Sequence, residues 1–121
     1  VVLTGTVDNP SGYGRICKDS DGKPSAIIEE LDCDDEQRKI KEINSGIMAF
    51  KTNVAANLVG KIKPNPKKNE YYLTDAIEIA YHEGIQASTY STSEEEVFGV
   101  NSKRDLAEAE KINRKKKIKR N

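Results

Sequence analysis

The chain has 121 residues, the length of one small domain, since domains usually run to about 100–200 residues. Hydrophobic residues make up 36% of it and charged residues 33%, with a mean hydropathy of −0.73. No stretch approaches the roughly 18 apolar residues of a membrane span, and no signal-peptide pattern opens the sequence. This composition argues against membrane insertion and secretion, so we expect a cytoplasmic protein with no membrane partner.

The net charge of zero hides two regions of opposite sign. Residues 1–101 hold 11 Lys and Arg against 17 Asp and Glu, a balance of −6, whereas residues 102–121 hold 9 against 3, a balance of +6. Only the basic end could contact nucleic-acid phosphates, and no aromatic residue is interleaved there for base stacking. We therefore expect a solvated helix end and no nucleic-acid partner.

Cysteine and histidine are too scarce for a disulfide scaffold or a zinc site. The chain contains Cys17, Cys33 and a single histidine, His82. His82 has no Ser or Cys partner at a recognisable spacing, which argues against a catalytic triad. Two isolated thiols fit a reducing compartment.

Alternating, β-rich segments predict strands in the first half of the chain. The expected strands are residues 1–7, 15–18, 25–30 and 43–50. Asp21-Gly22 is typical of a hairpin turn between the second and third of these. Pro24 stands at a strand entry, where a missing N–H costs least. Because the sequence opens inside a strand without an initiator Met, we expect it to continue a longer protein.

The second half alternates helices and strands. We expect short helices over 34–39 and 51–58, an exposed loop over 61–69, and strands over 85–90 and 97–100. Thr74 is expected to cap a helix over 75–83 that ends at Gly84. Ser102 opens a last helix with the spacing of a capping box. This alternation indicates an α/β layer architecture.

The run from Ser11 to Arg15, SGYGR, is a tight glycine turn that enters a strand. Gly12 and Gly14 would let backbone amides approach a ligand closely, as phosphates and nucleobases require. Arg15 could clamp a phosphate with two hydrogen bonds. An ordinary turn explains the same spacing, because Gly-x-Gly without a following helix is a weak signal.

At four further places, polar groups could either bind a ligand or serve an internal structural role. Glu29 and Asn44 could bind sugar hydroxyls as acceptor and donor, or make internal hydrogen bonds. Tyr72 and Thr74 stand at a helix N-terminus, a site for anions, or form a cap with a packing tyrosine. Asn101 follows an expected strand, where α/β sheets place ligand groups, and its amide oxygen could coordinate Mg²⁺ or simply form a turn.

Six sequence words, in one order, resemble those of a known enzyme family. They are 12–16 (GYGRI), 27–29 (IIE), 32–38 (DCDDEQR), 40–47 (IKEINSGI), 70–75 (EYYLTD) and 99–101 (GVN). Together they cover essentially the whole chain and resemble bacterial bifunctional N-acetylglucosamine-1-phosphate uridyltransferase/glucosamine-1-phosphate acetyltransferase. The matching part is the C-terminal half of the uridyltransferase domain. Each word alone is weak, and their common order is what is specific.

The resemblance implies an architecture and an activity. Residues 1–101 would be the sugar-binding half of a Rossmann-like nucleotidyltransferase domain with a mixed sheet. Residues 102–121 would be a basic linker helix leading toward an acetyltransferase domain, a left-handed β-helix through which the parent protein forms a homotrimer. The parent would join UTP and N-acetylglucosamine 1-phosphate into UDP-N-acetylglucosamine, a precursor of peptidoglycan and lipopolysaccharide, with Mg²⁺ as cofactor.

The resemblance also implies roles for individual residues. Gly14 would contact the sugar nucleotide through its backbone. Glu29 and Asn44 would hold the sugar, and Tyr72 and Thr74 would line its sugar and phosphate end. None of these groups does covalent chemistry, so we expect no catalytic residue within the chain.

Asn101 would be both a substrate-binding residue and one of two protein ligands of Mg²⁺. The other ligand, an aspartate, and the family's Gly-rich phosphate loop would precede Val1. Ser45 stands where the family usually has Thr and keeps the hydroxyl. The isolated chain would therefore contain the sugar half of an active site without the triphosphate half, and we expect it to be inactive alone.

Two other functions fit the same sequence. One is a uridylyl- or thymidylyltransferase acting on glucose 1-phosphate. The other is a non-catalytic binding or assembly module in which the helix from Ser102 docks a partner.

Overall fold

The computed structural model describes every residue from Val1 to Asn121. In chain order the elements are β1 (Val2–Thr6), β2 (Arg15–Lys18), β3 (Pro24–Ile28), the 3-10 helix η1 (Glu30–Asp32), α1 (Asp35–Arg38), β4 (Glu42–Met48), α2 (Thr52–Val59), α3 (Asp75–His82), β5 (Thr89–Thr92), the 3-10 helix η2 (Glu94–Glu96) and α4 (Lys103–Arg120).

The five strands form one mixed sheet in the order β3-β2-β4-β1-β5. β1 pairs antiparallel with β4 and parallel with β5, and β2 pairs antiparallel with β3. The hairpin of β2 and β3 joins the rest at a single antiparallel pair, Arg15 opposite Ile43. A mixed sheet with helices, followed by a C-terminal helix, confirms the predicted α/β class and agrees with part of a Rossmann-like domain.

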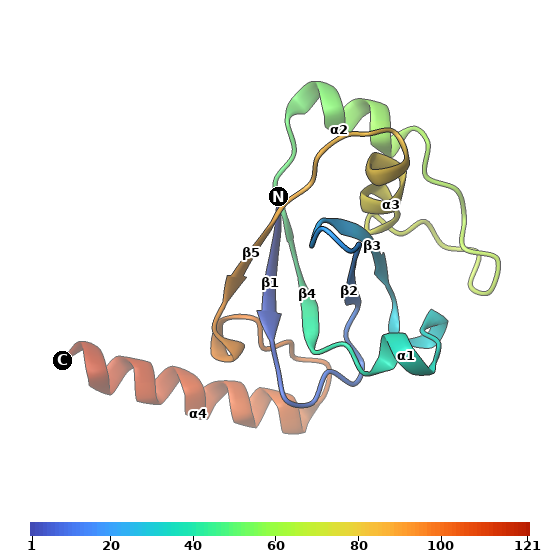
Figure 1. Ribbon diagram of the computed structural model, residues 1–121. Coiled ribbons are helices and arrows are strands. Elements are labelled where there is room, and N and C mark those ends of the chain that lie inside the picture. The colour runs from blue at the N-terminus through green and yellow to red at the C-terminus, as the bar shows by residue number, and fades with distance from the viewer.

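The helices occupy different sides of the molecule. α3 packs on β3 and contacts α2, so these two helices lie together near one end of the sheet (Figure 1). α4 begins near the opposite ends of the strands and runs away from them (Figure 1). No helix combines the length and the apolar character needed to cross a bilayer.

Three small clusters of buried side chains form the core. The first joins β1, β2, β3 and α3, the second lies where β4 meets the segment after η2, and the third lies between α2 and α3. Their members are, in that order, Val2, Ile16, Ile27 and Ile77; Val7, Ile43 and Val97; and Leu58, Ala76 and Ala80. The glycine turn contacts the first two clusters, since Ile27 lies beside Gly14 and Tyr13 packs on the second cluster.

The strand predicted over 97–100 is wrong, and the one predicted over 85–90 is displaced to β5. Val97 follows η2 and is buried at 5% exposure against Gly5 of β1. A Cβ at Gly5 would lie 2.5 Å from Val97 Cγ2, so the glycine gives this side chain its place. Val97 therefore covers β1 instead of joining the sheet as a strand residue.

The helix predicted over 75–83 begins at Asp75 as expected, but the capping role predicted for Thr74 is wrong. Thr74 makes no capping hydrogen bond, and its backbone is already helical, which corrects the predicted cap. Gly84 ends α3 with a φ of +72°, as expected. At α4, Ser102 Oγ accepts a hydrogen bond from the Asp105 N–H at 3.1 Å, as the capping spacing predicted.

Candidate functional site

Glu29, directly after β3, lies between the glycine turn and the start of α3. Thr74 Oγ1 donates a hydrogen bond to Glu29 Oε1 at 3.1 Å. On the other side, a Cβ at Gly14 would lie 3.4 Å and 3.5 Å from the two carboxylate oxygens. The hydroxyl of Thr74 thus serves a tertiary contact where a helix cap was predicted. Three of the six predicted binding residues therefore meet around one carboxylate.

Asn44 on β4 joins this group through its backbone. Its N–H donates to the Gly14 carbonyl at 2.9 Å, which ties the glycine turn to the strand. Its side-chain Oδ1 accepts a hydrogen bond from the Gly46 N–H at 3.0 Å. The register of β4 on β1 shifts at this point, because Gly46 has a φ of +88°. The internal hydrogen bond expected as the structural alternative is therefore present, and the half-buried amide is held in a fixed orientation.

Tyr72 and Asp75 frame Thr74 at the start of α3. Tyr72 is half-buried, and its carbonyl accepts a hydrogen bond from the Asp75 N–H at 3.1 Å. Burial raises the pKa of the Asp75 carboxyl, and the nearby charges of Glu78 and Asp32 raise it further. The raised pKa shows that Asp75 shares this side of the site with other carboxylates.

Asn101 lies in a different cavity, of about 300 Å³, between the glycine turn and the start of α4. Polar residues that line it include Asn9, Ser11, Glu94, Asn101 and Asp105. The Asn101 N–H donates to Asp105 Oδ2 at 3.1 Å, and Asn101 itself is exposed. This backbone hydrogen bond, helped by Ser102, lowers the pKa of the Asp105 carboxyl. Asn101 follows a loop here, and not the strand that was predicted.

Tyr13 connects the two sides of the site. It lines the cavity of Asn101 and immediately precedes Gly14. Its hydroxyl oxygen accepts a hydrogen bond from the Gly99 N–H at 3.0 Å. The cavity contains neither Glu29 nor Thr74, so the turn separates two adjoining surfaces.

The largest cavity lies elsewhere. It measures about 500 Å³, is mainly apolar, and opens between α2, α3 and the start of β1. None of the six predicted binding residues lines it.

Oxygen donors are the only metal-ligand chemistry near Asn101. No group of three or more His, Cys, Asp and Glu side chains is arranged to hold a metal. The Asn101 amide and the carboxylates of Glu94 and Asp105 line one cavity. Mg²⁺ takes one or two protein oxygens and keeps several waters, so the Asn101 amide oxygen is the right kind of ligand for it.

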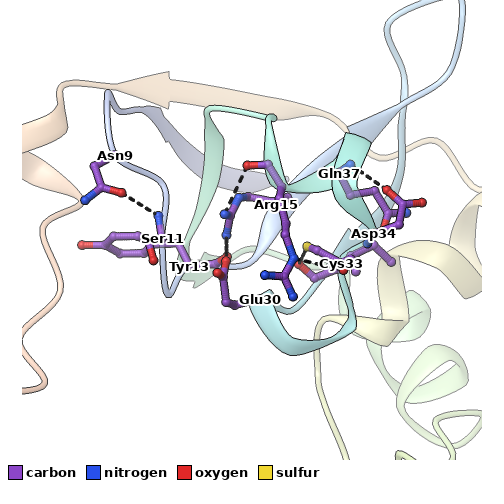
Figure 2. Close-up of polar contacts among 10 residues, drawn as sticks. Asn9, Ser11, Tyr13, Arg15, Glu30, Cys33, Asp34 and Gln37 are labelled. Atoms are coloured by element: carbon purple, nitrogen blue, oxygen red, sulfur yellow. Dashed lines mark hydrogen bonds and ion pairs between the residues drawn. The ribbon is translucent and has the colours of Figure 1, made fainter.

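The structure excludes the phosphate-binding role that the sequence left open for Arg15. Its side chain is 2% exposed and so is closed to an external phosphate. Figure 2 shows its guanidinium between Tyr13 and Glu30, with Nη1 donating to the Tyr13 carbonyl and to the Glu30 carboxylate. Arg15 opens a four-residue strand that also contains Lys18, so the local sequence carried no clear signal of its burial.

The sheet, the glycine turn and the polar groups around Glu29 define the chain as part of an α/β domain with a cluster of polar groups at its strand ends. No protein-family model matches it. It is 44% identical to the bifunctional protein GlmU of Clostridium tetani over 115 residues, which are 95% of this chain and 25% of that protein. The corresponding figures for GlmU of Dechloromonas aromatica are 49% over 111 residues, 91% of this chain and 25% of that protein.

A further relative, GlmU of Alkaliphilus metalliredigens, is 39% identical over 120 residues, 98% of this chain and 26% of that protein. The chain spans about a quarter of the length of the curated relatives it matches. It is homologous to a segment of the bifunctional GlmU proteins, and the family resemblance predicted from its six sequence words is confirmed.

Proposed function

We propose that the chain is the sugar-binding part of a nucleotidyltransferase whose full-length protein forms UDP-N-acetylglucosamine from UTP and N-acetylglucosamine 1-phosphate. The observation that carries this proposal is the Glu29 carboxylate between Gly14 and the Thr74 hydroxyl. A carboxylate held in this way accepts hydrogen bonds from the paired hydroxyls of a sugar. The similarity to GlmU proteins supports the same assignment.

In this proposal, the binding groups contact different parts of the substrate. Glu29 and the Asn44 amide hold the sugar ring, and the Gly14 backbone lies against the sugar nucleotide. Tyr72 and Thr74 line the sugar and its phosphate. Each group is neutral or acts as an acceptor, so their contribution is positioning, the main source of rate in nucleotidyl transfer.

Asn101 is the proposed Mg²⁺ ligand within the chain. The metal, when bound, supplies charge neutralisation between the sugar phosphate and the α-phosphate. Asp105 accepts a hydrogen bond from the Asn101 N–H and so holds the loop that carries the amide. Because one neutral amide binds Mg²⁺ weakly, a second ligand from outside these residues belongs to the proposal.

The proposal extends to the whole protein. Residues 1–101 are the sugar-binding half of the domain, and residues 102–121, mostly α4, are a linker toward an acetyltransferase domain. The parent is a cytoplasmic homotrimer of cell-wall precursor synthesis. The 121 residues alone do not turn over UTP, because the triphosphate-binding loop lies outside them.

The test uses the full-length protein that contains this chain. Glu29→Ala should chiefly raise the KM for N-acetylglucosamine 1-phosphate, and Asn101→Ala should strongly lower Mg²⁺-dependent turnover. Lys39→Ala, an exposed residue of an ion pair with Glu36, serves as the control. Unchanged kinetics in both site variants would remove the assignment.

Two further assays complete this test. Glucose 1-phosphate with UTP or dTTP is offered in parallel, and a higher kcat/KM for it would favour the alternative transferase. UDP-N-acetylglucosamine formed by the isolated 121-residue chain would contradict the proposed inactivity.

A further inference from the structure

Arg15 contacts three separate segments of the chain from one buried position. Nη1 donates to the Tyr13 carbonyl and to Glu30 Oε2, and Nη2 lies 3.4 Å from the Arg38 carbonyl. These partners belong to the glycine turn, to η1 and to the end of α1. The planar guanidinium directs its donors at fixed angles, so it fixes the separation of the groups that it binds.

The partners of Arg15 are the chain neighbours of the proposed sugar-binding groups. Tyr13 is bonded covalently to Gly14, and Glu30 to Glu29. Because the guanidinium binds both the Tyr13 carbonyl and the Glu30 carboxylate, it sets the distance between the Gly14 backbone and the Glu29 carboxylate.

Stability alone does not account for this arrangement. The Nε atom of Arg15 is buried and has no hydrogen-bond partner, which costs free energy. Glu30 retains 25% side-chain exposure, so the pair is buried on one side only. Well-packed apolar residues often replace a buried ion pair without loss of stability, so an ion pair that is kept at a cost points to another role.

We propose that Arg15 is a positioning residue that holds Gly14 and Glu29 at the spacing required by the sugar phosphate. The inference rests on the proposed function and adds to it a residue that does not touch substrate. It also replaces the possibility, left open by the sequence, that Arg15 binds a phosphate directly. The effect of Arg15 acts on sugar binding and leaves the nucleotide contacts and the chemical step unchanged.

The experiment compares variants of the full-length protein by steady-state kinetics and thermal melting. Arg15→Lys keeps the charge and removes the fork, Glu30→Gln removes the partner's charge, and Arg15→Met with Glu30→Met removes both charges. Lys39→Met is the control, because its exposed ion pair with Glu36 lies near the same elements. The KM for the sugar phosphate should rise roughly tenfold, which corresponds to a loss of about 1.4 kcal/mol of binding free energy.

The KM for UTP should stay at the wild-type value, and kcat should change far less than the sugar KM. The double variant should melt near the wild-type temperature and still show the raised sugar KM, which a purely structural role would not produce. An unchanged sugar KM in a folded variant overturns the inference, and so does loss of folding in all three. A wild-type protein that forms no nucleotide sugar overturns the proposed function instead.

Discussion

The two sides of the glycine turn are held in different ways. On the side of β3 and α3, Glu29 is fixed by a side-chain hydrogen bond from the buried Thr74 and rests above the core cluster that contains Ile27. On the side of α4, Asn101 is exposed and is held by one hydrogen bond, from its N–H to the Asp105 carboxylate. One side is thus preformed by packing, whereas the other depends on Tyr13 and a few local contacts.

The largest expected effect tests the packed side. Ile27→Ala should lower the free energy of unfolding by about 2–5 kcal/mol, because it removes buried methyl groups and leaves a cavity under Gly14 and Glu29. Val97→Ala removes fewer atoms from the smaller cluster and should cost less. Urea denaturation of the two variants measures both changes. A larger loss for Val97→Ala would reverse the comparison.

The next effect tests how Val97 is seated on the other side. Gly5→Ala places a methyl group where Val97 Cγ2 lies and should cost about 1–3 kcal/mol of unfolding free energy. The double variant Gly5→Ala, Val97→Ala should recover part of this loss. Gly60→Ala is the matched control, since its added Cβ meets no atom closer than 3.6 Å. Denaturant midpoints equal for Gly5→Ala and Gly60→Ala would show that Val97 moves freely.

Acid should weaken the packed side through Glu30. Burial alone raises the pKa of this carboxyl, but the hydrogen bond and charge of Arg15 outweigh it, so the pKa lies below the ordinary value of 4.5. A lowered pKa stabilises the fold above the unfolded-state value and loses that contribution as pH falls through the folded-state value.

The wild type should therefore lose more unfolding free energy below pH 4.5 than Glu30→Gln does. Melts recorded across this range measure the difference. Glu36→Gln, which removes an exposed carboxyl, should follow the wild type. Parallel curves for the wild type and Glu30→Gln would exclude the linkage.

The smallest effect concerns the link between the two sides. Tyr13→Phe removes the hydroxyl that accepts from the Gly99 N–H and should cost about 0.5–1.5 kcal/mol. Amide hydrogen exchange at Gly99 should accelerate more than exchange in β2. Tyr90→Phe, at a side chain that is 68% exposed, provides the control and should change neither quantity.

Elements with their own local signals could be predicted from the sequence. Asp34 and Gln37 form the reciprocal capping box of α1, and Gly84 ends α3 at a positive φ. The residues of segment 97–100 favour a strand, but the packing of Val97 against Gly5 determines the conformation instead. Gly5 is more than 90 residues away from Val97 in the chain, so no local sequence pattern could reveal this contact.

The candidate site shows the same difference between features with a local sequence signal and features set by distant contacts. The sequence supplied the identities of Gly14, Glu29 and Thr74, but it misjudged how Thr74 is used. A hydroxyl before a helix predicts a cap, and here a carboxylate 45 residues earlier accepts its hydrogen bond. For Arg15, charge suggested an external anion, and burial, which is a property of the fold, assigned the side chain to Glu30.

The parallel pairing of β1 with β5 has a consequence for biosynthesis. Within this segment β1 is synthesised before the strands it pairs with, since Val2 has its antiparallel neighbour at Met48 and its parallel neighbour at Thr89. Until the residues of β5 have been made, one edge of β1 stays open and able to pair with another chain. Long-range pairing of this kind slows folding, so a nascent polypeptide carrying this segment depends on protection of that edge during translation.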